Sequence, residues 1–143
     1  SSRMDRILFA RLPLRTGEDP IYEDDWTKIY PGRLEITWYY MPTAKSKYIN
    51  TSDIRAIYYR EQSEQDSDRV TGWGGSSTCW WACDQKRKLR DRSEDTHYNV
   101  LVQTMRQTDP LMGFTTNNIE DFLAAIQPFL NPGVVIKNDL PFR

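Results

Sequence analysis

The chain has 143 residues, which is the length of one globular domain with short extensions. Its 19 Lys and Arg residues oppose 20 Asp and Glu residues, so it lacks the large positive field of a generally basic nucleic-acid-binding or membrane-coating protein. Aromatic residues make up 13% of the chain, which excludes a disordered segment.

The termini and the rare residue types exclude several further classes. No apolar run approaches the roughly 20 residues of a membrane-spanning helix, and the first residues lack the basic and apolar regions of a signal peptide. Two cysteines and one histidine do not supply the four ligands of a structural zinc site, nor a disulfide framework. We therefore expect a soluble protein without metal or cofactor, which is cytoplasmic or peripheral at a membrane or cytoskeletal structure.

The first part of the chain predicts an arm followed by a hairpin. Residues 1–20 mix charges with prolines and are expected to form an irregular N-terminal arm. Residues 21–30 are rich in β-formers, Pro31-Gly32 is a turn pair, and residues 33–41 alternate with period 2, which is typical of a strand with one buried side. The residues expected on its buried side are Leu34, Ile36, Trp38 and Tyr40.

More short strands are expected along the middle of the chain. They are predicted over residues 47–50, 54–60, 78–84, 98–105 and 112–115. The acidic residues 61–68 predict a solvated loop, the glycines of 72–75 predict a turn around Trp73, and the basic run 86–92 predicts a long exposed loop.

One amphipathic helix is expected near the end. Its apolar residues recur at helical spacing and form a single stripe: Ile119, Phe122, Leu123, Ile126, Phe129 and Leu130. Asn117 and Glu120 have the spacing of a capping box, and Pro128 should end the helix near Gln127. Residues 131–143 are assigned to a C-terminal tail.

This order of elements predicts a mainly β domain with one C-terminal helix, built from about seven antiparallel strands over residues 21–130. It resembles the pleckstrin homology (PH)-like superfold. The segments that carry the resemblance are Pro31-Gly32, Ile54–Tyr59, Gly72–Gly74, Tyr98–Gln103 and Gly113–Leu123. The resemblance implies a partly open barrel or sandwich that the helix caps, and a binding or targeting module without catalytic residues.

Lipid-binding members of this superfold hold a phosphoinositide headgroup at the open end between the first strands, with a Lys, a spacer, and then Arg-x-Arg or Lys-x-Arg. Lys28 and Arg33 flank the first turn here, but Glu35 stands at the next position, so half of the pattern is present. The candidates for binding an anionic phospholipid comprise these two cations, two that follow and four of the basic run: Lys28, Arg33, Lys45, Lys47, Lys86, Arg87, Lys88 and Arg90.

Docking of a protein partner, within a larger scaffold protein, is the function that we expect first. Exposed Tyr and Trp residues are typical interface anchors, and the candidates are Tyr39, Tyr58, Tyr59 and Trp73. Trp38, Tyr40 and one of the pair Trp80-Trp81 are expected in the core instead. Homodimerisation through an exposed strand or through the helix is a further alternative, since a sheet edge is a natural pairing surface, and no nucleic-acid partner is expected.

Thiol chemistry is the remote alternative. On a strand, Cys79 and Cys83 would stand roughly 13 Å apart, beyond the limit of about 7 Å between the Cα atoms of a disulfide, so we expect buried and inert cysteines. A cysteine together with His97 and Asp95 has the composition of a thiol-catalysis set. A single histidine beside a charged loop is more often a surface residue, and we therefore expect no enzyme.

Overall fold

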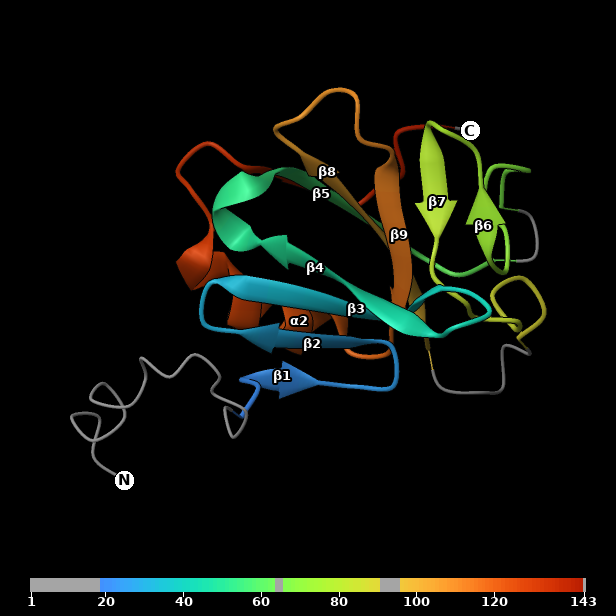
Figure 1. Cartoon of the computed structure of the whole chain (residues 1–143), viewed down its shortest axis with the longest axis horizontal. Coiled ribbons are helices and arrows are strands. Elements are labelled where there is room, and N and C mark those ends of the chain that lie inside the picture. The colour runs from blue at the N-terminus through green and yellow to red at the C-terminus, as the bar shows by residue number, and fades with distance from the viewer. Residues whose placement is uncertain (1–18, 64–65, 91–95, 143) are drawn as a thin grey trace.

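The computed structural model of the protein describes residues 19–63, 66–90 and 96–142, so most of the expected arm lies outside the described residues. Within them the fold is mainly β, with two open sheets and a single α-helix near the C-terminal end (Figure 1). The predicted class, mainly β with one C-terminal helix, is confirmed. The expected seven strands are not, because the sheets contain ten. No helix of the described residues has the length and apolar character needed to cross a membrane.

The first sheet is an antiparallel meander of four strands in the order β1-β2-β3-β4. The strands are β1 (Tyr22–Glu23), β2 (Thr27–Tyr30), β3 (Arg33–Tyr40) and β4 (Lys45–Asn50). Gly32 adopts a φ of +80° in the turn between β2 and β3, a conformation that glycine adopts at little cost. The turn η1 (Thr51–Asp53) then leads to the second sheet.

The second sheet has six strands in the order β10-β5-β8-β9-β7-β6. They are β5 (Ile54–Glu61), β6 (Gly74–Gly75), β7 (Cys79–Trp81), β8 (Tyr98–Thr104), β9 (Leu111–Thr116) and β10 (Val135–Lys137). Two pairs are parallel, β7 with β9 and β10 with β5, and neither was expected. The tail is therefore part of the sheet, and its Leu140 is buried in a core cluster with Trp81.

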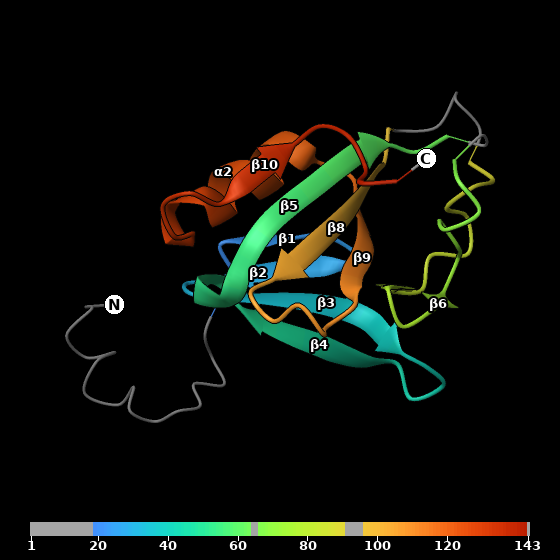
Figure 2. The same cartoon turned by 90° about the horizontal axis from the view of Figure 1, so that it is seen from above.

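The helix α2 (Ile119–Ile126) bridges the two sheets at one side of the molecule (Figure 2). The Phe122 ring lies edge-on to Tyr22 of the first sheet, at 5.9 Å, and tilted against Phe114 of the second, at 5.5 Å. A 3₁₀ turn, η2 (Gln127–Phe129), ends the helix where Pro128 was expected to end it. The cap is one residue later than predicted, because Asn118 Oδ1 accepts the N–H of Asp121 at 3.0 Å.

A β-bulge in β3 changes which of its aromatic residues are buried. The register with β4 shifts between Ile36 and Tyr40, and Trp38 has a φ of +57°. The side chains beyond the bulge therefore exchange faces, which places Tyr39 in the core at 4% exposure. Trp38 and Tyr40, which we expected in the core, are instead 48% and 43% exposed.

Candidate functional site

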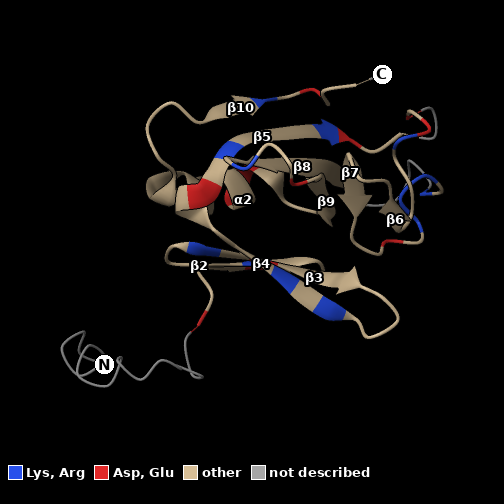
Figure 3. Ribbon diagram, turned by 45° about the horizontal axis from the view of Figure 1, so that its top comes forward, with Lys and Arg blue, Asp and Glu red and all other residues tan. Residues whose placement is uncertain are grey.

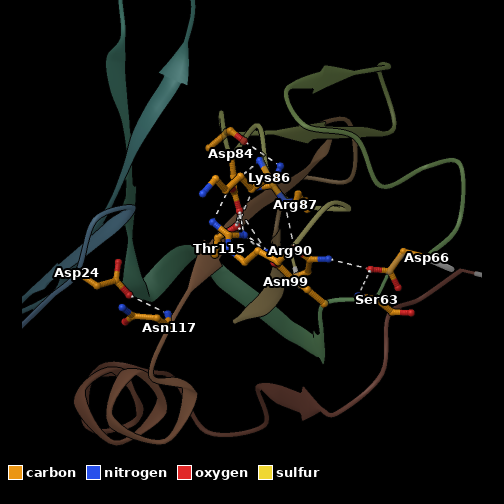
Figure 4. A network of polar contacts seen from close by, with 12 residues as sticks. Asp24, Ser63, Asp66, Asp84, Lys86, Arg87, Arg90, Asn99, Thr115 and Asn117 are labelled. Carbon is orange, nitrogen blue, oxygen red and sulfur yellow. Dashed lines mark hydrogen bonds and ion pairs between the residues drawn. The ribbon is translucent and has the colours of Figure 1, made fainter. Parts of the chain in front are cut away.

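The second residue of the basic run, Arg87, is buried and not solvated. Arg87 is 1% exposed, and each of its guanidinium nitrogens donates to an oxygen of this chain (Figure 4). Nε binds Asn99 Oδ1 at 3.1 Å, Nη1 binds the carbonyls of Thr71 at 2.7 Å and Ala82 at 3.0 Å, and Nη2 binds Thr115 Oγ1 at 3.1 Å. Arg87 is therefore a structural residue that offers no donor to an anion at the surface.

Asp84 forms the acidic centre of the same network. Arg90 binds it through both terminal nitrogens, at 2.8 and 3.0 Å, and the Thr115 hydroxyl donates to Asp84 Oδ2 at 2.6 Å. Burial alone would raise the pKa of the Asp84 carboxyl, but the bonds from Arg90 and Thr115 and the charges of Arg87 and Arg90 outweigh it and lower the pKa to about 2. Arg90 is thus neutralised by a carboxylate of its own chain.

The neighbouring loops close around this network. Lys88 Nζ donates to the Ser67 carbonyl at 3.1 Å, while Lys86 remains exposed. Asp66, which we expected in a solvated acidic loop, is buried and lies 2.9 Å from Arg60. Three of the four cations proposed from the basic run therefore point into the fold, and the exposed part of the set is Lys86.

The two candidate cations of the first hairpin have partners within the sheet. Lys28 on β2 lies 3.7 Å from Glu23 and pairs in register with Glu35 on β3. The guanidinium of Arg33 stacks 4.5 Å above the ring of Tyr30. Glu35, whose carboxylate accepts a hydrogen bond from the Ser46 hydroxyl at 2.7 Å, occupies the position on β3 where the lipid-binding pattern would need a further positive charge.

The two lysines of β4 differ from these in position. Lys47 of β4 pairs with Ile36, whereas Lys28 of β2 pairs with Glu35. Neighbouring residues of β3 point to opposite faces, so the side chains of Lys28 and Lys47 lie on opposite faces of the sheet. Lys45 is exposed at the start of β4. Figure 3 shows the cations spread over both sheets and the loops, with acids among them. The candidate cations therefore do not converge on one surface.

A cleft that sequence reasoning did not identify lies between β4 and the turn from β8 to β9. It has a volume of about 270 Å³. Its lining combines β4, η1 and both ends of that turn: Lys47, Tyr48, Ile49, Asn50, Asp53, Thr104, Met105, Arg106, Asp109 and Met112. Its two groups of lining residues, 47–53 and 104–112, are more than fifty residues apart in the chain, so no local pattern marks it.

Four aromatic residues gather where the end of β3 meets β6 and β7. We call Trp38, Tyr40, Trp73 and Trp80 the aromatic surface; the first three are 48%, 43% and 42% exposed. The indole N–H groups of Trp73 and Trp80 both approach the Tyr39 carbonyl at 3.4 Å, and the two rings pack edge-to-face at 5.5 Å. The two sheets are thereby joined beneath these exposed rings.

The other aromatic interface candidates lie elsewhere. Tyr39 is buried beneath the aromatic surface, contrary to the expectation that it would anchor a partner. Tyr58 and Tyr59 are half-buried on β5, where Tyr58 pairs with Lys137 of β10 and Tyr59 lies 6.2 Å from the Tyr98 ring. Trp73 is the predicted anchor that belongs to the aromatic surface.

The residues considered for thiol chemistry have separate surroundings. Cys79 and Cys83 are both free thiols; Cys79 is buried as expected, whereas Cys83 is only half-buried, and Asp95 lies outside the described residues. Burial raises the pKa of Cys79 to about 11, so it is protonated at neutral pH. The His97 ring lies edge-on to Trp26 at 5.4 Å. In the part of the chain that the structure describes, no group of three or more His, Cys, Asp or Glu residues is placed to hold a metal ion.

Two surfaces therefore present groups suited to recognition. The aromatic surface offers ring faces and edges, and the cleft beside β4 offers methionine side chains, a lysine and the edge of a sheet. No protein-family model, no curated protein and no solved structure matches this chain.

Proposed function

We propose that the chain is a non-catalytic binding module that docks a protein partner through the aromatic surface. The observation that carries this proposal is the exposure of three large aromatic side chains, Trp38, Tyr40 and Trp73, around one junction between the sheets. Trp and Tyr are the residues most enriched among those that dominate binding energy at protein interfaces. Large exposed aromatic residues on neighbouring segments mark interaction sites more often than scattered single residues do.

The backbone beneath the aromatic surface supports the same proposal. Trp38 keeps a φ of +57°, which is unfavourable for a side chain with a Cβ, and its carbonyl accepts the N–H of Cys83 at 2.9 Å. Such conformations cost about 1–3 kcal/mol and concentrate at functional sites. Here the unfavourable conformation holds a Trp side chain in solvent. A fixed arrangement of rings would also reduce the ordering entropy lost on binding.

A PH-like architecture belongs to the same proposal. An antiparallel meander, a second sheet and a helix that bridges them near the C-terminal end support it. The additional short strands β1, β6 and β10 are the departures from a seven-stranded pattern. In this reading the chain is a docking domain of a larger scaffold.

Binding of an anionic phospholipid is the alternative, and its geometric support is weaker. Lys45 and Lys86 are exposed, but Arg87, Lys88 and Arg90 are engaged within the fold. Sedimentation with vesicles that contain phosphoinositides, at low salt, separates the two proposals. Lipid binding predicts sedimentation that a charge reversal at these lysines abolishes, whereas protein docking predicts that the chain stays in the supernatant.

The protein-docking proposal is tested with a variant that truncates two exposed rings, Trp38→Ala with Trp73→Ala. Leu89→Ala is the matched control, because Leu89 is a 78% exposed apolar residue outside the aromatic surface. Proteins captured from cells by wild type and by each variant are compared by quantitative mass spectrometry, and the partner is then purified and titrated. We expect at least a 30-fold weaker Kd for the double variant and no change for the control.

Circular dichroism and unfolding curves establish that both variants are folded before the capture. A partner that binds the double variant as tightly as wild type would contradict the assignment of the aromatic surface. A capture in which no purified protein binds the wild-type chain would contradict the docking function itself.

A further inference from the structure

The first sheet ends in an open edge at β4. β4 stands at the end of the order β1-β2-β3-β4, so one side of it has no strand neighbour among the described residues. Thr51 donates to the Gly32 carbonyl at 3.0 Å, one position beyond the register pair of Asn50 with Arg33. Hydrogen-bonded and non-bonded pairs alternate along an antiparallel ladder, so the backbone groups of Tyr48 and Asn50 point away from β3.

These outward backbone groups face the cleft. Tyr48 and Asn50 both line it, and its opposite wall comes from the turn between β8 and β9. Met112 is 2% exposed at the cleft and Met105 is 50% exposed. Methionine is a flexible apolar residue that adapts to different ligands. A volume of about 270 Å³ is below the roughly 300–1,000 Å³ of sites for whole small ligands. It is the size expected for one or two side chains of a longer ligand.

The charges around the cleft favour an acidic ligand at the β4 side. The cleft is lined by two cations, Lys47 and Arg106, and by two acids, Asp53 and Asp109. Arg106 lies 3.9 Å from Asp109, and Asp53 lies on η1 beyond the end of β4, so the excess positive charge is on β4 itself. Lys45 and Lys47 of β4 have no carboxylate within 4.0 Å in the described part of the chain, and Lys47 is half-buried at the cleft. An acid on a strand laid beside β4 would meet these lysines, since opposite charges across strands are stabilising.

We propose that the β4 edge and the adjoining cleft bind an extended acidic peptide segment of a partner as an added strand. Its backbone pairs with Tyr48 and Asn50, one apolar side chain sits against Met105 and Met112, and a carboxylate pairs with Lys47. Added strands gain affinity from main-chain hydrogen bonds and specificity from pockets for alternate side chains. This surface is separate from the aromatic surface, so the inference does not depend on the proposed docking there.

One variant removes the backbone donor without disturbing the sheet. Asn50 has φ −72° and ψ 134°, and proline fixes φ near −65°. Asn50→Pro therefore fits the existing backbone, deletes an amide that points away from β3, and places a ring where the peptide carbonyl would bind. Asn50→Ala is its matched control, because it removes the same side chain and keeps the amide. Lys47→Glu tests the carboxylate contact, with Lys137→Glu on β10 as its control.

The probe is obtained by selecting displayed random ten-residue peptides against the full chain, and the enriched peptide is synthesised and titrated. We expect it to carry an apolar residue near an Asp or Glu, and to shift the amide resonances of Tyr48, Asn50 and Met105. Asn50→Pro and Lys47→Glu should each weaken binding at least tenfold, and both controls should bind as wild type. A peptide with Lys in place of its acid should recover binding to Lys47→Glu, which a merely structural role of Lys47 would not produce.

Several results would overturn this assignment. They are a selection without an enriched peptide, resonance shifts centred on the aromatic surface, or equal affinity of wild type and Asn50→Pro. Vesicle binding that Lys47→Glu abolishes, without peptide binding, would assign the edge to anionic lipid instead. The variant with Trp38→Ala and Trp73→Ala should retain the peptide, so loss of the proposed docking partner and loss of this peptide are separate outcomes.

Discussion

Replacing Arg87 by methionine tests whether the buried network stabilises the fold. Arg87→Met keeps a long, flexible side chain in place and removes the charge and every donor of the guanidinium. Lys86→Met is the matched control, because it removes one positive charge from the adjacent, exposed position. If the basic run were a solvated loop, the two substitutions would have similar and small effects.

The expected loss follows from the acceptors that Arg87 leaves behind. The carbonyls of Thr71 and Ala82 each lose a donor, at 2.7 and 3.0 Å, and an unsatisfied buried acceptor costs about 1–3 kcal/mol. The guanidinium also lies 4.7 Å from the centre of the Trp81 ring, which contributes about 0.5–2 kcal/mol. Asn99 keeps a donor from Gln62 at 3.0 Å and adds less. We expect Arg87→Met to lower the free energy of unfolding by about 3–5 kcal/mol.

Unfolding in urea, followed by tryptophan fluorescence, measures both variants against wild type. Lys86→Met should change the free energy of unfolding by less than about 0.5 kcal/mol. Arg87→Lys should fall between wild type and Arg87→Met, because one ammonium group cannot reach acceptors in three directions. If Arg87→Met unfolds within about 1 kcal/mol of wild type, the network is not the stabilising element inferred above.

The remaining predictions concern pH, packing and capping. The pKa of Asp84 is about 2 in the folded protein and 3.8 for an ordinary Asp, so its stabilising effect is complete above pH 3.8 and is lost as the pH falls through 2. Between pH 5 and pH 2, the free energy of unfolding of wild type, measured in urea, should fall by about 2 kcal/mol more than that of Asp84→Asn. Gly113→Ala should lower the unfolding free energy by about 2 kcal/mol, measured by thermal circular dichroism, because its Cβ would lie 2.3 Å from Trp81 Cε3; an unchanged melting temperature would contradict this packing. Asn118→Ala should cost about 1 kcal/mol in the same assay by removing the bond from the Asp121 N–H, and an equal effect of Asn117→Ala would contradict the assigned cap.

The elements with a strong local pattern were predictable from the sequence. The alternation of residues 33–41 and the helical spacing after residue 117 identified β3 and α2, since both patterns depend only on near neighbours. The helix start was wrong by one residue because Asn117 and Asn118 are equally good capping residues. Both patterns thus located their elements more securely than they fixed individual positions within them.

Features set by distant parts of the chain were not predictable in this way. The bulge at Trp38 exchanged the exposed and buried aromatic residues of β3, and its carbonyl is held by the N–H of Cys83, 45 positions later. β10 has three residues, and Val135 is half exposed, so its pattern is too short to indicate a strand. Its pairing with β5 depends on the folded position of the tail.

The basic run shows why charge composition alone is a poor guide to a ligand surface. Its cations suggested an anion site because most of the groups that bind them are not visible in the local sequence. Asp84 lies just before the run, but the other oxygens come from the distant residues Asn99, Thr115 and Ser67. A near-neutral chain can satisfy many of its cations internally, and here it does so for most of the run. Cations that have no acid within 4.0 Å among the described residues, such as Lys47, are therefore more informative about partners than the longest basic stretch.

The buried network and the aromatic surface are connected through β7. Arg87 holds the Ala82 carbonyl, the N–H of neighbouring Cys83 holds the Trp38 carbonyl, and Trp80 of β7 supports Trp73. The donors of the basic run thus fix the strand on which two rings of the aromatic surface rest. Among the described residues, β4 makes no hydrogen bond to this network and is held by β3 instead, although Met112 at the back of the cleft pairs with Trp80 of β7. A substitution in the network should consequently disturb docking at the aromatic surface more than strand addition at β4, whose backbone is held by β3.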